Sequence, residues 1–395
     1  MNEEIRKKSK GRRWAGRIIL LATAIIVVVL AGSGCVRGLA PVGWSGGTAT
    51  EGKLYVGSNE GRLVAVNLAD ESRQWSEALK PASGSGGFFG CSSAAATGGG
   101  LGCGTGSAGV AVYGTPVVAG DLVYMAGYNG KIYAYNKDTL AIRWVYPREG
   151  NMEPLVGGGI VYEGRYYIGD SDGRVHALDA ATGDSLWQFT TGDKIWATPA
   201  AKDGTVYIGS FDNKLYALDA ADGTVKWEFT AEGALITTPL VANGAIYFGS
   251  FDRNLYAVNT ADGGLKWKFM ADNWFWAQPV LHNGTIYAGS LDNKVYALKA
   301  DTGALVTEFD LGSPVSSTPV VVEDKVIFAS RKGVISAINT VNNQIGQLAD
   351  LEAEVNGPLA AVEGILYVHT HDLTLHRINT ANGAILRSIS LKSQQ

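Results

Sequence analysis

The chain has 395 residues, of which 46% are hydrophobic and 18% are charged, and its formal net charge at pH 7 is −4. This composition excludes an intrinsically disordered chain, and the length is sufficient to bury a sizeable core. The 52 glycines, 17 tyrosines and 10 tryptophans favour strands joined by tight turns, because glycine adopts positive φ and aromatic side chains suit half-buried sheet surfaces. The composition therefore predicts an all-β fold.

The first residues have the pattern of a targeting segment. Residues 1–17 carry seven basic and two acidic side chains, and Ile18–Val36 carries no charge. Basic residues before an apolar run predict that the following chain is exported. Two attachments stay open for residues 1–35. The preferred interpretation is a signal peptide cleaved before Cys35, with a lipid on that cysteine. The alternative is an uncleaved membrane helix, because about 19 uncharged residues can span a bilayer.

The three cysteines fit an oxidising compartment. If Cys35 carries the lipid, Cys91 and Cys103 remain as an even pair, which predicts a disulfide between them. The alternative is three unrelated thiols. Both cysteines of the pair lie in a glycine- and serine-rich insertion at residues 81–109. The part of the chain after residue 35 has 26 basic and 35 acidic residues, a net charge of −9, so it is a poor partner for nucleic acid or an anionic bilayer.

A repeat of about forty residues organises the rest of the chain. One unit, residues 198–229, shows short apolar alternations separated by three turn signals, Asp203-Gly204, Asp212-Asn213 and Asp222-Gly223, which predicts four strands. The residues that end the second strand of successive units are Gly57, Ala126, Gly169, Gly209, Gly249, Gly289, Ala329 and His369. Eight such units predict an eight-bladed β-propeller of four-stranded antiparallel blades over residues 36–395.

The phrase ALDAATGDSLW, residues 177–187, illustrates the second half of a unit. Asp179 ends the third strand, where its carboxylate can accept a hydrogen bond from a nearby backbone N–H, and Gly183 supplies a left-handed turn position. Trp187 lies on the outer strand, where its large ring can pack against a neighbouring blade. The phrase is therefore interpreted as structural. The tryptophans at this repeat position are Trp75, Trp144, Trp187, Trp227 and Trp267.

The last three units lack this tryptophan, which predicts less regular packing near the closure of the ring. Residues Ile385–Leu391 complete the outer strand of the eighth unit from the same stretch of chain. We therefore expect the ring to close without strong exchange of a strand between its first and last blades, although residues 36–43 could add a short edge strand.

Aromatic residues gather just before the predicted inner strands, at the mouth of the central channel. The candidate binding residues there are Trp44, Tyr113, Glu153, Trp196, Trp274 and Trp276. A ring of aromatic side chains can stack a planar ligand or hold a partner's peptide. The alternative is that these rings fill the funnel of the propeller. Asp193, Lys194 and Asp272 lie in the same connections and can add polarity.

No metal site or catalytic motif is predicted. The predicted hairpin turns contain one aspartate per blade, too far apart for calcium, and such turns favour aspartate for local reasons. These aspartates are Asp172, Asp212, Asp252, Asp292 and Asp372. His369 and His371 share one face of a strand but have no third ligand nearby in the sequence. The sequence contains no nucleophile motif, phosphate loop or nucleotide fingerprint.

From Gly43 to the C-terminus, the repeats resemble the PQQ-type propeller repeats that quinoprotein dehydrogenases share with BamB-type lipoproteins of outer-membrane assembly. A single exported propeller is similar to the BamB type, which implies a non-catalytic, membrane-tethered scaffold on the extracytoplasmic side that binds cell-envelope protein partners. The alternatives are a PQQ-dependent quinoprotein dehydrogenase and a propeller that senses a small ligand. Quinoprotein alcohol dehydrogenases hold PQQ between a tryptophan and a disulfide of adjacent cysteines. No two cysteines are adjacent here, so we expect neither PQQ nor another cofactor.

Overall fold

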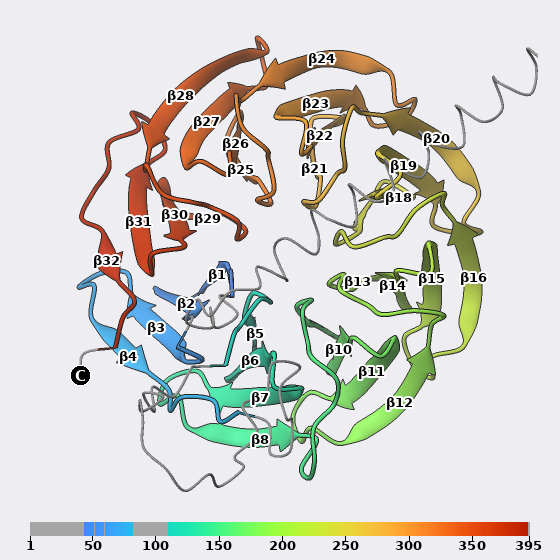
Figure 1. Ribbon diagram of the computed structural model, residues 1–395, viewed down its shortest axis with the longest axis vertical. Coiled ribbons are helices and arrows are strands. Elements are labelled where there is room, and N and C mark those ends of the chain that lie inside the picture. Colours follow the sequence, from blue (N-terminus) through green and yellow to red (C-terminus); the bar gives the residue numbers. More distant parts are fainter. Residues whose placement is uncertain (1–42, 51, 59, 82–109, 394–395) are drawn as a thin grey trace, which may run out of the picture. The chain divides into compact units, whose positions relative to one another are not determined.

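The computed structural model describes residues 43–50, 52–58, 60–81 and 110–393 of the chain. These residues form eight four-stranded antiparallel sheets, arranged as blades around a central axis (Figure 1). The structure confirms the predicted all-β, eight-bladed propeller. Each blade is one continuous stretch of chain whose four strands follow one another in order from the axis to the rim.

The strands have the following bounds. The first four blades contain β1 (Gly47–Thr50), β2 (Lys53–Gly57), β3 (Leu63–Asn67), β4 (Arg73–Trp75), β5 (Val117–Ala119), β6 (Leu122–Gly127), β7 (Lys131–Asn136), β8 (Ile142–Tyr146), β9 (Ile160–Tyr162), β10 (Arg165–Gly169), β11 (Arg174–Asp179), β12 (Ser185–Thr190), β13 (Ala200–Lys202), β14 (Thr205–Gly209), β15 (Lys214–Asp219) and β16 (Val225–Thr230). The last four contain β17 (Leu240–Ala242), β18 (Ala245–Gly249), β19 (Asn254–Asn259), β20 (Leu265–Met270), β21 (Val280–His282), β22 (Thr285–Gly289), β23 (Lys294–Lys299), β24 (Leu305–Asp310), β25 (Val320–Val322), β26 (Lys325–Ala329), β27 (Val334–Asn339), β28 (Gln344–Asp350), β29 (Ala360–Val362), β30 (Ile365–Thr370), β31 (Thr374–Asn379) and β32 (Ile389–Ser390).

Several predictions about the N-terminal part fall outside the described residues and stay predictions. They are the anchor in residues 1–35, the lipid on Cys35, and the disulfide between Cys91 and Cys103. Within the described ranges, no helix is long and apolar enough to cross a membrane.

The core of the propeller lies between the blades. All five residues of β14 are buried, because the blades stack face to face and both sides of a middle strand meet a neighbour. The short turns agree with the sequence. Asp203 and Gly204 have φ of +50° and +67°, as a tight two-residue hairpin requires, and the carboxylate of Asp179 accepts a hydrogen bond from the N–H of Ala181 at 2.9 Å.

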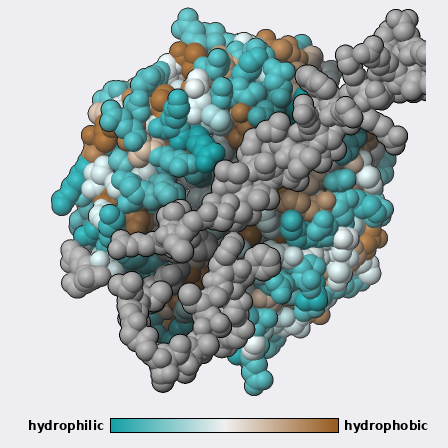
Figure 2. All heavy atoms as spheres, in the orientation of Figure 1, coloured by the Kyte–Doolittle hydropathy of each residue, from teal (hydrophilic) through white to brown (hydrophobic). Residues whose placement is uncertain are grey.

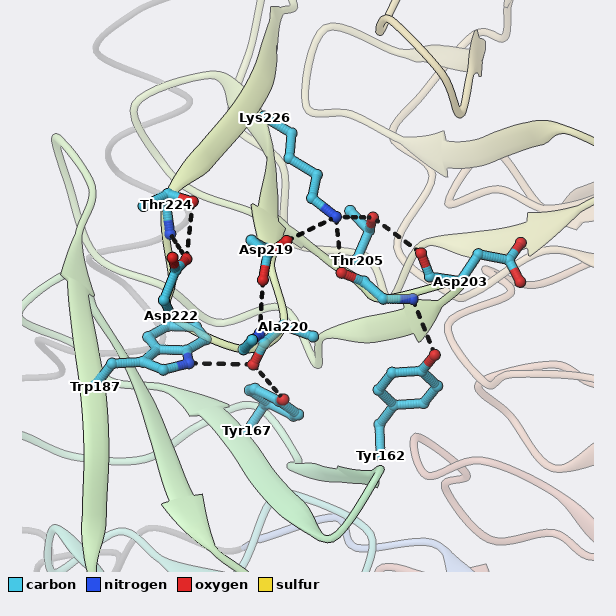
Figure 3. Close-up of polar contacts among 12 residues, drawn as sticks. Tyr162, Tyr167, Trp187, Asp203, Thr205, Asp219, Ala220, Asp222, Thr224 and Lys226 are labelled. Carbon is cyan, nitrogen blue, oxygen red and sulfur yellow. Dashed lines mark hydrogen bonds and ion pairs between the residues drawn. The ribbon is translucent and has the colours of Figure 1, made fainter.

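The tryptophans of the outer strands contact the next blade. Figure 3 shows Trp187 of β12 and Tyr167 of β10 converging on the carbonyl of Ala220 in the fourth blade. The indole Nε1–H donates to this oxygen at 3.2 Å and the tyrosine hydroxyl at 2.8 Å. Equivalent bonds join Tyr124 and Trp144 to Ala180, Trp227 to Thr260, and Tyr247 and Trp267 to Ala300. At the first blade, the buried Nε1 of Trp75 has no partner within the described residues.

The glycine of the repeated phrase receives the indole ring of the preceding blade. A Cβ atom placed on Gly303, whose φ is +70°, would lie 2.6 Å from a ring carbon of Trp267. In the same way, Gly183 lies against Trp144. The glycine and the tryptophan of ALDAATGDSLW therefore serve two different blade contacts, one on each side of the third blade.

Cationic side chains link the blades at two of the contacts where tryptophan is absent. The Nζ of Lys325 in the seventh blade donates to the carbonyl of Thr380 in the eighth, at 3.1 Å. At the seam, where the eighth blade meets the first, Arg377 and Arg387 both pair with Glu71. An apolar cluster also bridges the seam and contains Leu54, Val56, Val64, Val66, Tyr367, Leu375, Ile389 and Leu391.

The eighth blade departs from the prediction in one respect. We expected Ile385–Leu391 to form its outer strand, but β32 contains only two residues, and Ile385 makes an isolated bridge to Ile378. Between them, Arg387 stands at the tryptophan position with 82% of its side chain exposed, so no buried ring holds this stretch in the sheet. Among the described residues, β29 to β32 pair only with one another, as expected for closure without strand exchange. The short edge strand that residues 36–43 could add lies almost entirely outside the described residues.

Candidate binding surface at the channel mouth

The two ends of the ring carry different connections. The turn between the second and third strands of a blade lies beside the connection that enters its inner strand: the N–H of Gly192, between β12 and β13, donates to Asp212, between β14 and β15, at 2.6 Å. We term this end the mouth face. The opposite end, with the two other turns of each blade, is termed the far face.

An arc of half-buried aromatic side chains crosses blades four to six on the mouth face. This aromatic arc consists of Trp196, Phe211, Phe251, Trp274 and Trp276. The ring of Phe211 meets Trp196 edge to face, with centroids 4.8 Å apart, and lies 6.0 Å from Phe251. Phe251 stacks on Trp274 at 4.4 Å, and Trp276 is 6.0 Å away. Phe211 and Phe251 thus connect Trp196, which the sequence predicts at the mouth, with the predicted Trp274 and Trp276.

Alternation along the connections explains why these tryptophans point out of the core. Ile195, immediately before Trp196, is fully buried between blades, and so is Phe275, between Trp274 and Trp276. In an extended segment successive side chains point to opposite sides. Burying the residue at one position therefore directs its neighbours toward the mouth.

The predicted polar residues of the mouth lie in different places. The ammonium of Lys194 lies 4.5 Å from the ring centre of Phe211 and 5.2 Å from that of Trp196, within the range of a cation–π interaction. Asp193 accepts a hydrogen bond from the N–H of Lys194. Glu153 is exposed on the connection between β8 and β9, away from blades four to six.

A second aromatic group occupies the mouth at blades one and two. The rings of Trp44 and Tyr113 are 4.6 Å apart, and Tyr113 lies 5.5 Å from Tyr128. Burial, with a contribution from Tyr128, raises the pKa of Tyr113 to about 12, so this hydroxyl stays neutral at physiological pH. On blades seven and eight the same position holds Ser316 and Asn356, whose side chains are 3.2 Å apart. The aromatic residues therefore form two groups instead of the continuous ring considered above.

Sequence reasoning missed Phe211, Phe251 and Tyr128. Each lies two residues after the aligned residue that ends the predicted second strand of its blade. The sequence indicated only a turn there. The recurrence of Ser-Phe-Asp in two consecutive units, at residues 210–212 and 250–252, was the available signal.

The aspartates of the hairpin turns hold the mouth face together. The second carboxylate oxygen of Asp212 accepts from Tyr216 at 2.7 Å, in addition to Gly192. Asp252 and Asp292 make the corresponding contacts in the fifth and sixth blades. Within the portion that the structure describes, no three His, Cys, Asp or Glu side chains are placed to hold a metal ion.

A small pocket lies beside the seam. Its lining residues are Gly43, Trp44, Glu354, Asn356, Gly357, His369, Thr370 and His371, and it has room for about one water molecule. His369 Nδ1 lies 2.8 Å from the carbonyl oxygen of Ser45; because a carbonyl only accepts, Nδ1 carries the hydrogen. The buried Nε2 has no partner among the described residues. His369 thus links the eighth blade to the first in its neutral form.

Acidification is expected to weaken this seam. Burial lowers the pKa of His369 below its usual 6.5, despite the hydrogen bond to Ser45 and the charge of Asp372, which raise it, while His371 adds to the lowering. As the pH falls, the unfolded chain therefore binds a proton on this histidine near pH 6.5, whereas the folded chain binds it only at a lower pH. The contribution of His369 to the free energy of unfolding is therefore present above pH 6.5 and is lost below it. Urea midpoints at pH 7.5 and 5.5 should differ more for the native chain than for His369→Asn, which keeps a donor near Ser45. Equal pH dependence in the two proteins would contradict this assignment.

Elsewhere the surface shows no comparable apolar feature in the described residues. Along the ring axis, the visible rim mixes hydrophilic and hydrophobic residues in small groups (Figure 2). Exposed aliphatic residues near the start of outer strands are Ile142, Leu186, Val225, Leu265, Leu305, Val306, Ile345 and Ile385. No blade contributes more than two of them, and scattered exposed aliphatic residues are normal on protein surfaces. The aromatic arc differs because it gathers side chains from several blades.

Fold and repeats together define an eight-bladed propeller of the PQQ-like repeat class. The family model described as outer membrane protein assembly factor BamB matches residues 36–194 and 171–389, and the chain belongs to this family. The resemblance inferred from the repeats is thereby confirmed.

Curated relatives and solved structures agree with this membership. The outer membrane protein assembly factor BamB of Shewanella oneidensis is 29% identical over 146 residues, 36% of this chain and 30% of that protein. The protein of the same name from Kangiella koreensis is 28% identical over 145 residues, 37% of this chain and 31% of its own length. The chain thus spans about a third of the length of the curated relatives it matches.

Two solved structures share the fold. The crystal structure of BamB from Moraxella catarrhalis superposes with a TM-score of 0.61 at 19% identity, covering 70% of this chain and 87% of that one. The computationally designed Ika8 protein superposes with a TM-score of 0.67 at 13% identity, covering 85% and 95%. At these identities the two structures show the shared fold alone.

Proposed function

We propose that the chain is an exported, membrane-tethered and non-catalytic scaffold that binds a cell-envelope protein through the aromatic arc. The observation that carries this proposal is the arc itself: five aromatic side chains from neighbouring blades, half-buried and in mutual contact on one face. Rigid aromatic side chains are the usual energetic anchors of protein interfaces. Family membership and the apolar N-terminal segment support a location in the envelope.

The occupant we propose for the arc is an extended peptide segment with aliphatic or aromatic side chains. Edge-to-face and stacked rings offer several shallow apolar contacts in a row, which suits a segment better than one compact ligand. The net charge of −9 after residue 35 disfavours nucleic acid and anionic lipid as occupants. Lys194 at the end of the arc adds one positive charge.

The absence of catalysis is part of the proposal. The chain's three cysteines, Cys35, Cys91 and Cys103, include no adjacent pair, and the aspartates in the mouth turns are engaged by backbone N–H groups and tyrosine hydroxyls. These features support a scaffold over a quinoprotein dehydrogenase. Substrate-dependent reduction of a dye by the purified chain with PQQ and calcium would contradict this part.

Changes in the arc are expected to abolish partner binding while leaving the fold intact. Phe251→Ala and Trp274→Ala each remove one of the two stacked rings, and the loss of an interface anchor of this kind costs about 2 kcal/mol or more, roughly a thirtyfold loss of affinity. The measurement is quantitative mass spectrometry of proteins crosslinked to the full-length chain in membranes. The matched control is Val341→Ala, which truncates a side chain that is 74% exposed on the far face.

The proposal requires a specific partner that is retained by the control and lost from both arc variants. Thermal unfolding of each variant should show that the propeller stays folded at the temperature of the assay. If the same proteins are recovered with all four chains, the arc does not bind the partner.

A further inference from the structure

We propose that the small pocket beside the seam, termed the seam pocket, binds the ammonium group of a lysine side chain from a protein partner. The pocket lies on the mouth face, because its residues come from the connections that enter β1 and β29 and from the turn between β30 and β31. It is separate from the aromatic arc on blades four to six, so this inference goes beyond the proposed function and does not depend on it. Three features carry the inference: a buried acceptor, a carboxylate and an aromatic wall.

The acceptor is the Nε2 atom of His369. This residue is 8% exposed and lines the seam pocket. Its Nδ1–H donates to the carbonyl of Ser45, so Nε2 carries a lone pair and no hydrogen. No described residue donates to this buried nitrogen, and a buried acceptor without a partner is costly. The pocket therefore requires a hydrogen-bond donor.

A carboxylate determines the charge of that donor. The Oε1 atom of Glu354 accepts from the Nε–H of Arg331 at 2.7 Å and from the amide of Asn356 at 3.1 Å, whereas Oε2 has no hydrogen bond from the described residues. Burial raises the pKa of Glu354, but the hydrogen bonds from Arg331 and Asn356 and the neighbouring charges outweigh burial and hold this pKa below its usual range. An ionised carboxylate with one oxygen left over favours a cationic donor.

The aromatic wall is the ring of Trp44, which also lines the seam pocket. Tyr113 packs against this ring edge to face, with centroids 4.6 Å apart, and so fixes its position. An aromatic face attracts an ammonium group, and it also offers apolar surface to the aliphatic stem of a lysine. The stem distinguishes a lysine side chain from a small free amine.

The size of the pocket selects lysine over arginine. The seam pocket has room for about one water molecule. The ammonium group of lysine is compact, whereas the guanidinium group of arginine is a wider planar fork. A net charge of −9 after residue 35 also favours a partner with basic side chains over an acidic one.

Nuclear magnetic resonance of the histidines tests this assignment. The chain contains five histidines, so the full-length protein labelled with nitrogen-15 at histidine gives few signals, and His369→Asn identifies the signal of His369. The probe is Nα-acetyl-lysine methylamide. The Nε2 signal of His369 should shift saturably as this atom accepts a hydrogen bond. The signal of His176, which is buried in the third blade, should stay unchanged and reports that the propeller is folded.

The selectivity of this shift identifies the ligand. The corresponding arginine and Nε-acetyl-lysine compounds, and ammonium chloride, should each bind about tenfold more weakly or worse, because they lack the compact charge or the stem. Glu354→Gln should weaken binding of the lysine compound by about tenfold or more. The matched control is Glu352→Gln, which removes the same charge from an exposed residue of the same connection and should leave the affinity unchanged.

Trp44→Leu gives a second test that keeps the charge of the pocket, and it should weaken binding by about threefold or more. An unshifted His369 signal at tens of millimolar lysine compound would overturn the proposal. So would equal affinities of the native chain and Glu354→Gln, or equal affinities for the lysine compound and either ammonium chloride or the arginine compound. These outcomes leave the crosslinking test of the aromatic arc unaffected, so the two proposals can fail separately.

Discussion

Trp267→Ala is expected to lower the free energy of unfolding by about 3–5 kcal/mol, the usual cost of removing a large buried aromatic side chain. Only 8% of Trp267 is exposed. Its Nε1–H donates to the carbonyl of Ala300 at 3.0 Å, so the ring joins the fifth blade to the sixth by packing and by a hydrogen bond. Equilibrium denaturation in urea measures the loss. Trp267→Phe should lose less, because phenylalanine keeps part of the buried aromatic ring at this blade contact.

Substitutions at two glycines of the sixth blade distinguish the effect of contact with the indole ring from the effect of backbone strain. Gly303 and Gly284 have nearly the same φ, +70° and +74°, but a Cβ on Gly303 would meet Trp267 at 2.6 Å, whereas a Cβ on Gly284 would have no atom within 4 Å. Gly284→Ala should cost about 1 kcal/mol, as expected for alanine at positive φ. Gly303→Ala should cost about 1–3 kcal/mol more, because it also overpacks the blade contact. Equal losses would show that the ring does not occupy this position in solution.

The second large effect is expected at the buried pair of Asp170 and His176 in the third blade. The side chains are 0% and 3% exposed, and the Nε2 of His176 lies 2.8 Å from a carboxylate oxygen of Asp170. The other oxygen accepts from the N–H groups of Asp172 and Arg174, at 2.9 Å each. Burial alone raises the pKa of Asp170, but the hydrogen bonds outweigh burial and hold this pKa below its usual range. Asp170→Ser should therefore cost about 3 kcal/mol, since it leaves buried polar groups without partners.

The other blades suggest how this loss can be recovered. In the fourth blade the equivalent residues are Ser210 and Tyr216, and the tyrosine hydroxyl donates to the aspartate of the hairpin turn. Combining Asp170→Ser with His176→Tyr should therefore restore part of the stability, with a coupling energy of about 1–3 kcal/mol. Urea denaturation of the two single variants and the double variant gives this coupling. Strictly additive losses would mean that the pair can be exchanged only as part of a larger set of residues.

The sequence predicts the blades well because the information for them is local. Each hairpin is encoded by alternation and by turn residues such as Asp203-Gly204, which recur at constant spacing. The acceptor of Trp187 could not be predicted in this way. It is a backbone carbonyl 33 residues away, at Ala220, and any residue can supply a carbonyl. Similarly, the short β32 follows from the exposed Arg387 at the seam, a consequence of closing the ring.

The candidate surface was only half predictable for the same reason. Alignment of the units placed Trp196 and Trp276 at one blade position, but it could not show that Phe211 and Phe251 lie between them. These contacts join a turn of one blade to the connection before it and to the turn of the next blade. Only the assembled ring brings those segments together.

The way the ring closes has a mechanical consequence. Because no strand of the described residues crosses from the eighth blade into the first, these two blades are joined by side-chain contacts: the pairs of Arg377 and Arg387 with Glu71, the hydrogen bond of His369 to Ser45, and the apolar cluster beside them. Gly43, the first residue that the structure describes, lies next to this seam. Like the contacts between the sixth, seventh and eighth blades, the seam has no tryptophan that donates across it, and unlike them it has no backbone connection, so a pull on Gly43 loads the first blade at its side-chain contacts with the eighth.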